Sequence, residues 1–340
     1  MKYNQLGKTG VLVSELCLGT MTFGGRGYWT AIGQLSQDEV NQLVKTAFDH
    51  GINFFDTANA YSEGLAEQLF GNSLKTLGIG RQQVIIATKE RLRMGEGANQ
   101  VGLSRLHIFD SVDDSLARLG VSHIDMLYIH GVDPITPIEE TMRALGDVVR
   151  SGKVRYLGVS NHPAWMVVKA NDFAERTGGY KFVASQNFYS IASRDIEREI
   201  VPMAMSEGIS IIPWSPLAGG FLSGKYTRNN QVAGDSRRDN FDFPPLNKEK
   251  AYDIIDKMAD IGQHYSASPA RVALAWAGEK PGVTSVIIGA KRMDQLMDNI
   301  ASTELKLSEE DSRELDSISS LTPEYPGWMV ERQMTGRFPA

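Results

Sequence analysis

The chain has 340 residues, of which 42% are hydrophobic and 22% charged, as in an ordinary globular protein. Its net charge of −6 argues against a nucleic-acid-binding surface, because phosphate groups require an excess of lysine and arginine. With a single cysteine, no signal-peptide h-region and no apolar run near the ~18 residues of a membrane span, we expect a cytoplasmic protein without disulfides that does not bind a membrane.

Eight short apolar runs follow one another along the chain, each rich in β-branched or aromatic residues and short enough to form a buried parallel strand. These runs cover residues 15–19, 52–57, 84–89, 124–130, 154–160, 182–187, 210–215 and 283–289. Helix signals lie between them. Ser36 and Glu39 form a capping box, and the helix that follows should end at Gly51. Further helix starts are predicted at Pro137, Pro163 and Pro269.

Alternating strands and helices leave two architectures, an open doubly wound sheet or a closed barrel. An open dinucleotide-binding sheet would carry a G-x-G-x-x-G turn after its first strand, and residues 19–25 lack that spacing. Eight regular units therefore favour an α/β fold of the (β/α)8 TIM barrel type. We expect one domain over residues 1–340, with extra helices near its C-terminus.

Two stretches interrupt the repeat. Residues 2–14 contain two glycines between short extended pieces, which predicts a β-hairpin that plugs the bottom of the barrel. Residues 216–245 are long, polar and rich in glycine, asparagine, aspartate and arginine. Loops of that length in a compact domain usually act as lids or binding loops, and we expect the same here.

Four chemically active side chains fall at the ends of consecutive predicted strands, where barrel active sites form. Asp56 and Tyr61 follow the second run, Lys89 ends the third and His130 ends the fourth. A free tyrosine has a pKa of about 10, too high for efficient proton donation, and a neighbouring ammonium lowers it. We expect Lys89 to have this effect while Asp56 keeps the lysine charged. Tyr61 would then protonate a carbonyl oxygen that His130 orients, and a cofactor would supply hydride.

Each of these side chains has an ordinary reading when taken alone. Asp56 could cap a helix, Lys89 could be a solvated strand terminus, and His130 could be a structural histidine. Tyr61 could simply pack over a loop. Their joint placement at consecutive strand ends favours catalysis over four separate accidents.

The segments that carry these residues resemble the aldo-keto reductase superfamily, above all NFFDTANAYSEGLAEQLFG, IIATK and IDMLYIH. The resemblance extends over residues 3 to about 318 and includes LGKTGVLVSELCLGTMTFGG, GKVRYLGVSN, SQNFYS, WSPLAGGFLSGKY and IIGAKRMDQLMDNI. The last two are most similar to microbial reductases and potassium-channel β-subunits. The resemblance implies an NADPH-dependent oxidoreductase that reduces aldehydes and ketones.

The same resemblance implies how NADPH (NADP+) is held. Ser160, Asn161 and Gln186 would bind the nicotinamide carboxamide, Trp214 would stack on its ring, and the backbone around residues 215–220 would hold the pyrophosphate. The full set of implied cofactor contacts is Gly19, Thr20, Met21, Asp56, Ser160, Asn161, Gln186, Trp214, Ser215, Pro216, Leu217, Gly219, Lys225, Gly289, Lys291, Gln295, Asp298 and Asn299. No metal is expected.

Lys291, after the eighth run, could pair with the 2′-phosphate and favour NADPH over NADH, alone or with Arg292. The alternative is that both residues are a solvated helix start, and relatives usually carry serine or arginine at position 291. Two further departures are Ser62 and Glu90, which replace glycines that often follow the catalytic tyrosine and lysine.

Two functions of other classes stay open at this point. One is an NADPH-binding regulatory subunit with little turnover, as potassium-channel β-subunits illustrate. The other is an aldolase with Lys89 as Schiff-base former, which a charged lysine disfavours. The expected partner is a small carbonyl substrate, and a homo-oligomer is compatible with the sequence. Phe23, Tyr28 and Trp29, or the tail residues Tyr325 and Trp328, could line an apolar substrate wall, or could equally be ordinary loop packing.

Overall fold

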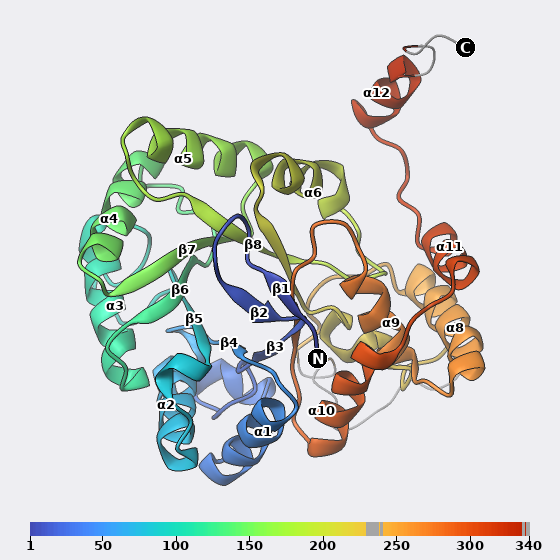
Figure 1. Ribbon diagram of the computed structural model, residues 1–340, viewed down its shortest axis with the longest axis horizontal. Helices are drawn as coiled ribbons and strands as arrows, with labels where there is room; N and C mark the ends of the chain where they lie inside the picture. The colour runs from blue at the N-terminus through green and yellow to red at the C-terminus, as the bar shows by residue number, and fades with distance from the viewer. Residues whose placement is uncertain (229–237, 239–240, 335–336, 338–340) are drawn as a thin grey trace.

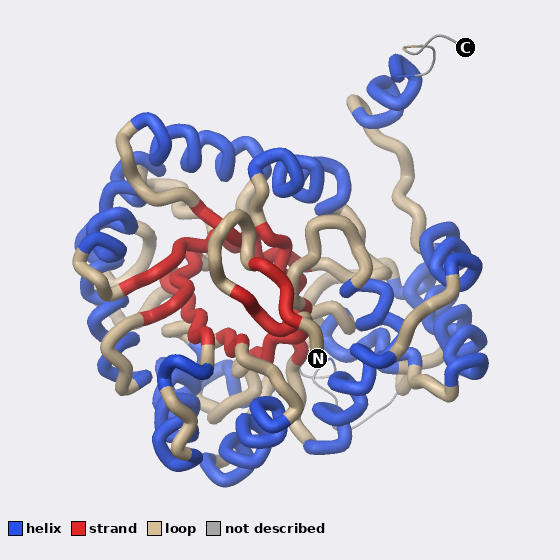
Figure 2. Tube along the Cα trace, viewed as in Figure 1, coloured by secondary structure: helices blue, strands red, loops and turns tan. Residues whose placement is uncertain are grey.

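In the computed structural model, all residues are described except 229–237, 239–240, 335–336 and 338–340 (Figure 1). Eight parallel strands form one sheet in the order β10-β3-β4-β5-β6-β7-β8-β9. They are β3 (Leu16–Gly19), β4 (Phe54–Asp56), β5 (Ile85–Glu90), β6 (Ile124–Ile129), β7 (Val154–Ser160), β8 (Phe182–Phe188), β9 (Ser210–Trp214) and β10 (Val286–Ile288). A parallel bridge between Ile211 and Val283 joins the two edges. The structure confirms all eight predicted strands and the (β/α)8 barrel, with helices around the ring of strands (Figure 2).

The predicted helix boundaries also agree with the structure. Both hydrogen bonds of the Ser36–Glu39 capping box are present, and Gly51 follows the first helix with a φ of +87°. Pro137 and Pro163 immediately precede helices, and Pro269 begins one. The helices are α1 (Gln37–Asp49), α2 (Leu65–Leu77), α3 (Arg105–Leu119), α4 (Ile138–Arg150), α5 (Ala164–Arg176), α6 (Ile196–Glu207), α8 (Lys248–Tyr265), α9 (Pro269–Gly278), α10 (Met293–Ile300), α11 (Glu309–Ile318) and α12 (Gly327–Met334).

The N-terminal hairpin pairs β1 (Tyr3–Gln5) with β2 (Leu12–Ser14) and lies across one end of the barrel (Figure 1). The amide of Gly7 donates to Ser210 Oγ at 2.7 Å, and Asn4 Nδ2 donates to the Thr284 carbonyl at 2.8 Å. Ser210 begins its strand, so the hairpin caps the N-terminal ends of the strands. Leu6 is fully buried against the barrel interior, which confirms the predicted plug.

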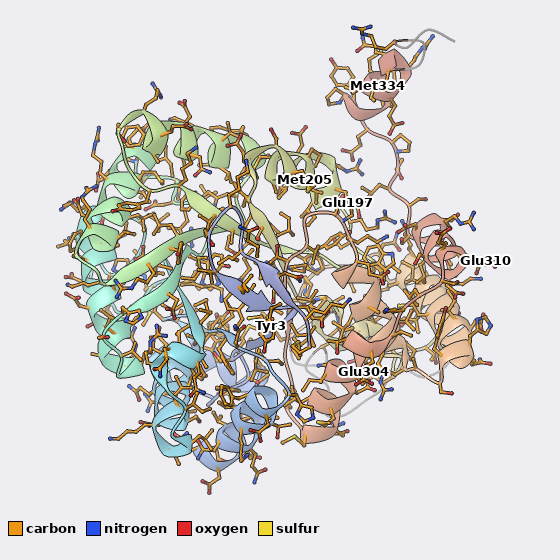
Figure 3. All side chains as sticks on the ribbon, in the orientation of Figure 1. Tyr3, Glu197, Met205, Glu304, Glu310 and Met334 are labelled. Carbon is orange, nitrogen blue, oxygen red and sulfur yellow. The ribbon has the colours of Figure 1, made fainter. Side chains whose placement is uncertain are left out.

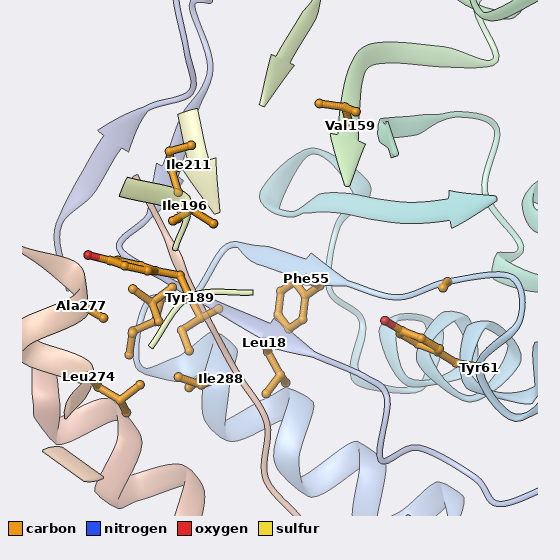
Figure 4. Close-up of a cluster of buried hydrophobic side chains, with 14 of the residues drawn as sticks. Leu18, Phe55, Tyr61, Val159, Tyr189, Ile196, Ile211, Leu274, Ala277 and Ile288 are labelled. Carbon is orange, nitrogen blue, oxygen red and sulfur yellow. The ribbon is translucent and has the colours of Figure 1, made fainter. Parts of the chain in front are cut away.

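Strand alternation divides the apolar residues into two layers. The inner layer fills the barrel and includes Phe54, Met126 and Tyr128. The outer layer lies between strands and helices, and Figure 4 shows Leu18, Phe55 and Ile288 from three neighbouring strands within it.

The long loop after β9 and the C-terminal tail are the parts that leave the barrel repeat. Of the loop predicted over 216–245, residues 229–237 and 239–240 lie outside the described residues. The tail carries α12 away from the barrel, and Met334 marks its far end (Figure 3). Among the described residues, no helix has the length and apolar character needed to cross a membrane.

Glu90, the last residue of β5, is an ionisable group in the outer layer. It pairs in register with Ile129, which belongs to that layer, and it is 1% exposed. Within the described part of the chain, neither carboxyl oxygen has a hydrogen-bond partner. Burial raises the pKa of Glu90 to about 8, so this carboxyl is protonated at neutral pH.

We therefore expect Glu90→Gln to stabilise the protein in a pH-dependent way. The carboxyl ionises near its ordinary pKa in the unfolded chain but only near pH 8 in the folded one, so stability falls between these values. The advantage of the variant should grow across this interval by up to about 1.4 kcal/mol per pH unit and then level off. Denaturant unfolding at pH 5, 6.5 and 8 measures it. Glu96→Gln, at an exposed residue, is the control, and a pH-independent gain for Glu90→Gln would contradict a buried neutral carboxyl.

Candidate active site

The side chain of Lys89 lies inside the barrel with no exposed surface. Its Nζ pairs with an oxygen of Asp56, donates to the Thr57 carbonyl at 2.7 Å and lies 3.3 Å from Tyr61 Oη. Burial alone would lower the pKa of Lys89, but the Asp56 carboxylate and the Tyr61 hydroxyl outweigh it and raise the pKa above its ordinary value. Lys89 is therefore a charged ammonium whose three N–H groups all have acceptors.

The second oxygen of Asp56 also has a partner. Gln186 Nε2, from β8, donates to Asp56 Oδ1 at 2.8 Å. Because Asp56 and Lys89 come from the neighbouring strands β4 and β5, Gln186 fixes the pair from across the barrel. All three side chains are buried, so their relative positions have little freedom.

An unusual turn positions Tyr61. It begins a short 3₁₀ segment, η2 (Tyr61–Gly64), in which Ser62, Glu63 and Gly64 have φ values of +49°, +56° and +86°. Positive φ costs energy in residues with a side chain, and here a hydrogen bond from Ser62 Oγ to the Phe23 carbonyl at 3.0 Å offsets part of it. The serine that replaces the usual glycine therefore keeps the glycine-type conformation. Tyr61 itself is buried under Trp29, at a ring distance of 5.0 Å.

His130 completes the cluster at the end of β6. Its ring lies 5.9 Å from the Tyr61 ring, measured between centroids. Burial, together with the positive charges of Lys89 and Arg91, holds the pKa of His130 well below its ordinary value. The imidazole is thus neutral at pH 7 and has one N–H to donate. Its Nδ1 has no hydrogen-bond partner among the described residues.

The residues expected around a nicotinamide lie together beside this cluster. Asn161, with a φ of +55°, donates from Nδ2 to the His130 carbonyl at 3.1 Å and to Ser160 Oγ at 3.0 Å. Its Oδ1 accepts from Trp214 Nε1 at 3.0 Å. The ends of β6, β7 and β9 are therefore linked through one amide side chain.

Trp214 has aromatic neighbours that the sequence analysis did not identify. Phe188 lies 5.0 Å away, and Phe243 lies nearly parallel to it at 5.9 Å and 12°. Phe243 belongs to the loop after β9, so this loop reaches the expected nicotinamide site. No short-range pattern in the sequence links positions 214 and 243.

The turn expected to hold a pyrophosphate has the backbone of an anion-binding turn. After Ser215, Pro216 and Leu217 comes η4 (Ala218–Ser223), and residues 215, 218, 219 and 220 all have positive φ. The Gly219 amide donates to Ser215 Oγ at 2.9 Å. Lys225 follows the turn and is exposed.

Arg238, another residue that the sequence analysis missed, holds this turn in place. It is 7% exposed and donates from Nη1 to the Ala218 carbonyl at 2.7 Å. Its Nε is buried without a hydrogen-bond partner among the described residues. Thr20 Oγ1, between Gly19 and Met21 after β3, is in the same situation. Both buried donors fit a bound group rich in oxygen acceptors, such as a dinucleotide phosphate or ribose.

The residues after β10 form a second expected cofactor segment. Gly289 is exposed, and a Cβ added to it would meet no atom within 4 Å. Gln295 Oε1 accepts from the Lys291 amide at 2.9 Å, and Asn299 Nδ2 donates to the Gly289 carbonyl at 3.3 Å. The Asp298 carboxylate instead binds two groups at the start of α9, Arg271 Nε at 2.6 Å and Ser268 Oγ at 2.7 Å.

The expected aromatic substrate wall is only partly present. Tyr28 and Trp29 pack together at 4.5 Å and adjoin Tyr61. Phe23, however, is fully buried in the outer layer, and its carbonyl accepts the hydrogen bond from Ser62 Oγ. In the C-terminal tail, α12, which contains Trp328, lies apart from the ring of strands (Figure 1), and Tyr325 and Trp328 are both exposed.

Comparison with known proteins agrees with this fold. The sequence model of the Aldo/keto reductase family matches residues 15–320. A versiconal hemiacetal acetate reductase from Aspergillus parasiticus is 36% identical, with 96% of this chain and 99% of that protein covered. A probable voltage-gated potassium channel subunit beta from Oryza sativa subsp. japonica is 35% identical, with 95% and 94% covered. With a family match over most of its length, the chain belongs to the aldo/keto reductase family.

Proposed function

We propose that this oxidoreductase reduces aldehydes and ketones to alcohols with NADPH, and that Tyr61 is the general acid. The observation that carries the proposal is the 3.3 Å contact between Tyr61 Oη and the buried ammonium of Lys89. A positive charge this close to a phenol, at a separation too short to admit a water molecule, stabilises the phenolate. The phenol can then release its proton at neutral pH.

Each polar group around Tyr61 contributes to proton delivery. Asp56 keeps Lys89 charged, and Gln186 keeps Asp56 in place. The neutral His130 donates its N–H to the carbonyl oxygen of the substrate and orients it toward the tyrosine hydroxyl. As negative charge develops on that oxygen, Tyr61 transfers its proton, and Lys89 stabilises the phenolate that remains.

The chain offers residues that fit a dinucleotide along the same mouth. NADPH, when bound, supplies the hydride. Ser160, Asn161 and Gln186 would hold the carboxamide. Trp214 would stack on the ring, which would then replace one of the contacts that Phe188 and Phe243 make with it. We propose the pyrophosphate site at residues 215–220 with Arg238, and the adenosine phosphate site at Lys291.

The channel-subunit relative supports a second candidate, a cofactor-binding sensor with little turnover. The complete group of Asp56, Tyr61, Lys89 and His130 favours an enzyme, because each member has a role in proton transfer. Single-domain organisation and a cytoplasmic location stay predictions.

Tyr61→Phe should remove the proton donor and leave the ring packing intact. We expect turnover with an aldehyde to fall by at least about a hundredfold, while NADPH binds as before. Absorbance at the NADPH band measures turnover, and fluorescence titration measures binding. Tyr325→Phe, on an exposed tyrosine of the C-terminal tail, is the control. Near-normal turnover in Tyr61→Phe would refute the mechanism, and tight NADPH binding without turnover in the unmodified protein would favour the sensor.

Lys291→Ala should weaken the binding of NADPH but not that of NADH, because only NADPH carries the 2′-phosphate that the ammonium would bind. We expect the KM for NADPH to rise roughly tenfold or more and the KM for NADH to change little. Arg292→Ala is the comparison, since Arg292 Nε and Nη2 already donate to the Asp294 carboxylate, at 2.9 and 2.8 Å. An equal rise in the KM for NADPH and for NADH in Lys291→Ala would show that this lysine does not bind the 2′-phosphate.

A further inference from the structure

Arg91 stands at the mouth of the barrel, two residues beyond Lys89. Its Nε and Nη2 both donate to the Val132 carbonyl, at 3.1 and 2.9 Å. Val132 in turn lies two residues beyond His130. The guanidinium therefore bridges the two loops that extend directly from the catalytic lysine and histidine.

The backbone around Arg91 holds this position. Arg91 has a φ of +132°, a conformation that residues with a side chain rarely adopt, and its carbonyl accepts from the Gly102 amide at 2.8 Å. Strain of this kind persists only where surrounding contacts enforce it, and it is concentrated at functional sites. The loop is thus folded so that this side chain stays beside the mouth.

The charge of Arg91 has no counter-ion in the described part of the chain. The nearest acid along the facing loop, Asp133, accepts from the Leu103 and Ile135 amides and from Thr136 Oγ1 instead. Glu90 is protonated in the outer layer. Burial lowers the pKa of both His130 and His162, and the positive charge of Arg91 lowers each further, so both rings are neutral at pH 7. The mouth therefore holds a partly exposed cation next to the catalytic histidine.

We propose that Arg91 binds an anionic group, a carboxylate or a phosphate, on the far side of the carbonyl substrate from its reacting carbon. The inference rests on the proposed function and names the class of substrate. A guanidinium has five N–H donors in a planar fork that matches such oxygen pairs. Two are used on Val132, and Nη1 makes no hydrogen bond with a described residue. A residue that only linked the two loops would need a hydrogen-bond donor but no positive charge.

The test compares an acid with its neutral ester. In NADPH-dependent reduction, 4-carboxybenzaldehyde is paired with methyl 4-formylbenzoate, and the 3-substituted pair allows for a different reach. D-Glyceraldehyde 3-phosphate against D-glyceraldehyde distinguishes phosphate from carboxylate. We expect wild-type protein to prefer the anion of at least one pair. In Arg91→Gln, kcat/KM for that anion should fall roughly ten- to hundredfold, mainly through KM, and kcat/KM for its neutral partner should stay within about twofold.

Two variants separate recognition from loop structure. Arg91→Lys keeps the charge and should retain part of the preference for the anion. Arg93→Gln removes a charge from the same loop, where Arg93 donates to the Gly95 and Gly97 carbonyls, and should leave kcat/KM for both substrates of the pair unchanged. Equal losses for anion and neutral partner in Arg91→Gln, or no preference in wild-type protein, would overturn the proposal while carbonyl reduction stands.

A binding measurement keeps the two proposals apart. Should no aldehyde be reduced at all, the proposed function fails, and the anion site is then tested without turnover. Calorimetric titration with 4-(hydroxymethyl)benzoate, the product alcohol of the first acid, and with inorganic phosphate would be run on wild-type protein and Arg91→Gln. Weaker binding of either anion in the variant supports the site. Equal binding of the anions by wild-type protein and Arg91→Gln, or no binding by wild-type protein, would rule out the anion site.

Discussion

The buried ammonium of Lys89 is the interaction on which the site depends. A charge without water is costly unless acceptors surround it, and Lys89 has three: Asp56, the Thr57 carbonyl and Tyr61. All three acceptors belong to β4 or to the segment that follows it. The Lys89 amine therefore holds both this strand and the strained 3₁₀ turn in position. Gln186 adds a contact from the opposite side of the barrel. The geometry of the proposed acid thus follows from satisfying a single charge.

Lys89 and Glu90 show how strand alternation sets chemistry. The two residues are adjacent and equally buried, yet they face different layers. The inner layer supplies Lys89 with a carboxylate and so keeps it charged, whereas the outer layer gives Glu90 no partner and keeps it protonated. His130 is neutral as well, so its uncharged ring lies among the charged groups Lys89, Asp56 and Arg91.

Sequence alone predicted the strands, the hairpin and the proximity of Asp56, Tyr61, Lys89 and His130. Short-range patterns mark buried strands, and the strands of a barrel end at one face. It failed where contacts depend on distant segments. No sequence pattern near Arg238 indicates its hydrogen bond to the Ala218 carbonyl, and none near Phe243 indicates its ring contact with Trp214. For Phe23 the sequence left open a place at the mouth or ordinary loop packing, and the structure buries it in the core.

The hairpin under the barrel has a kinetic meaning. With Leu6 and its neighbours sealing the floor, everything that reaches Lys89 must come and go by the opposite rim. Two ligands bound in this site together would therefore share a single opening. The one bound nearer the floor could leave only after the one bound above it had left.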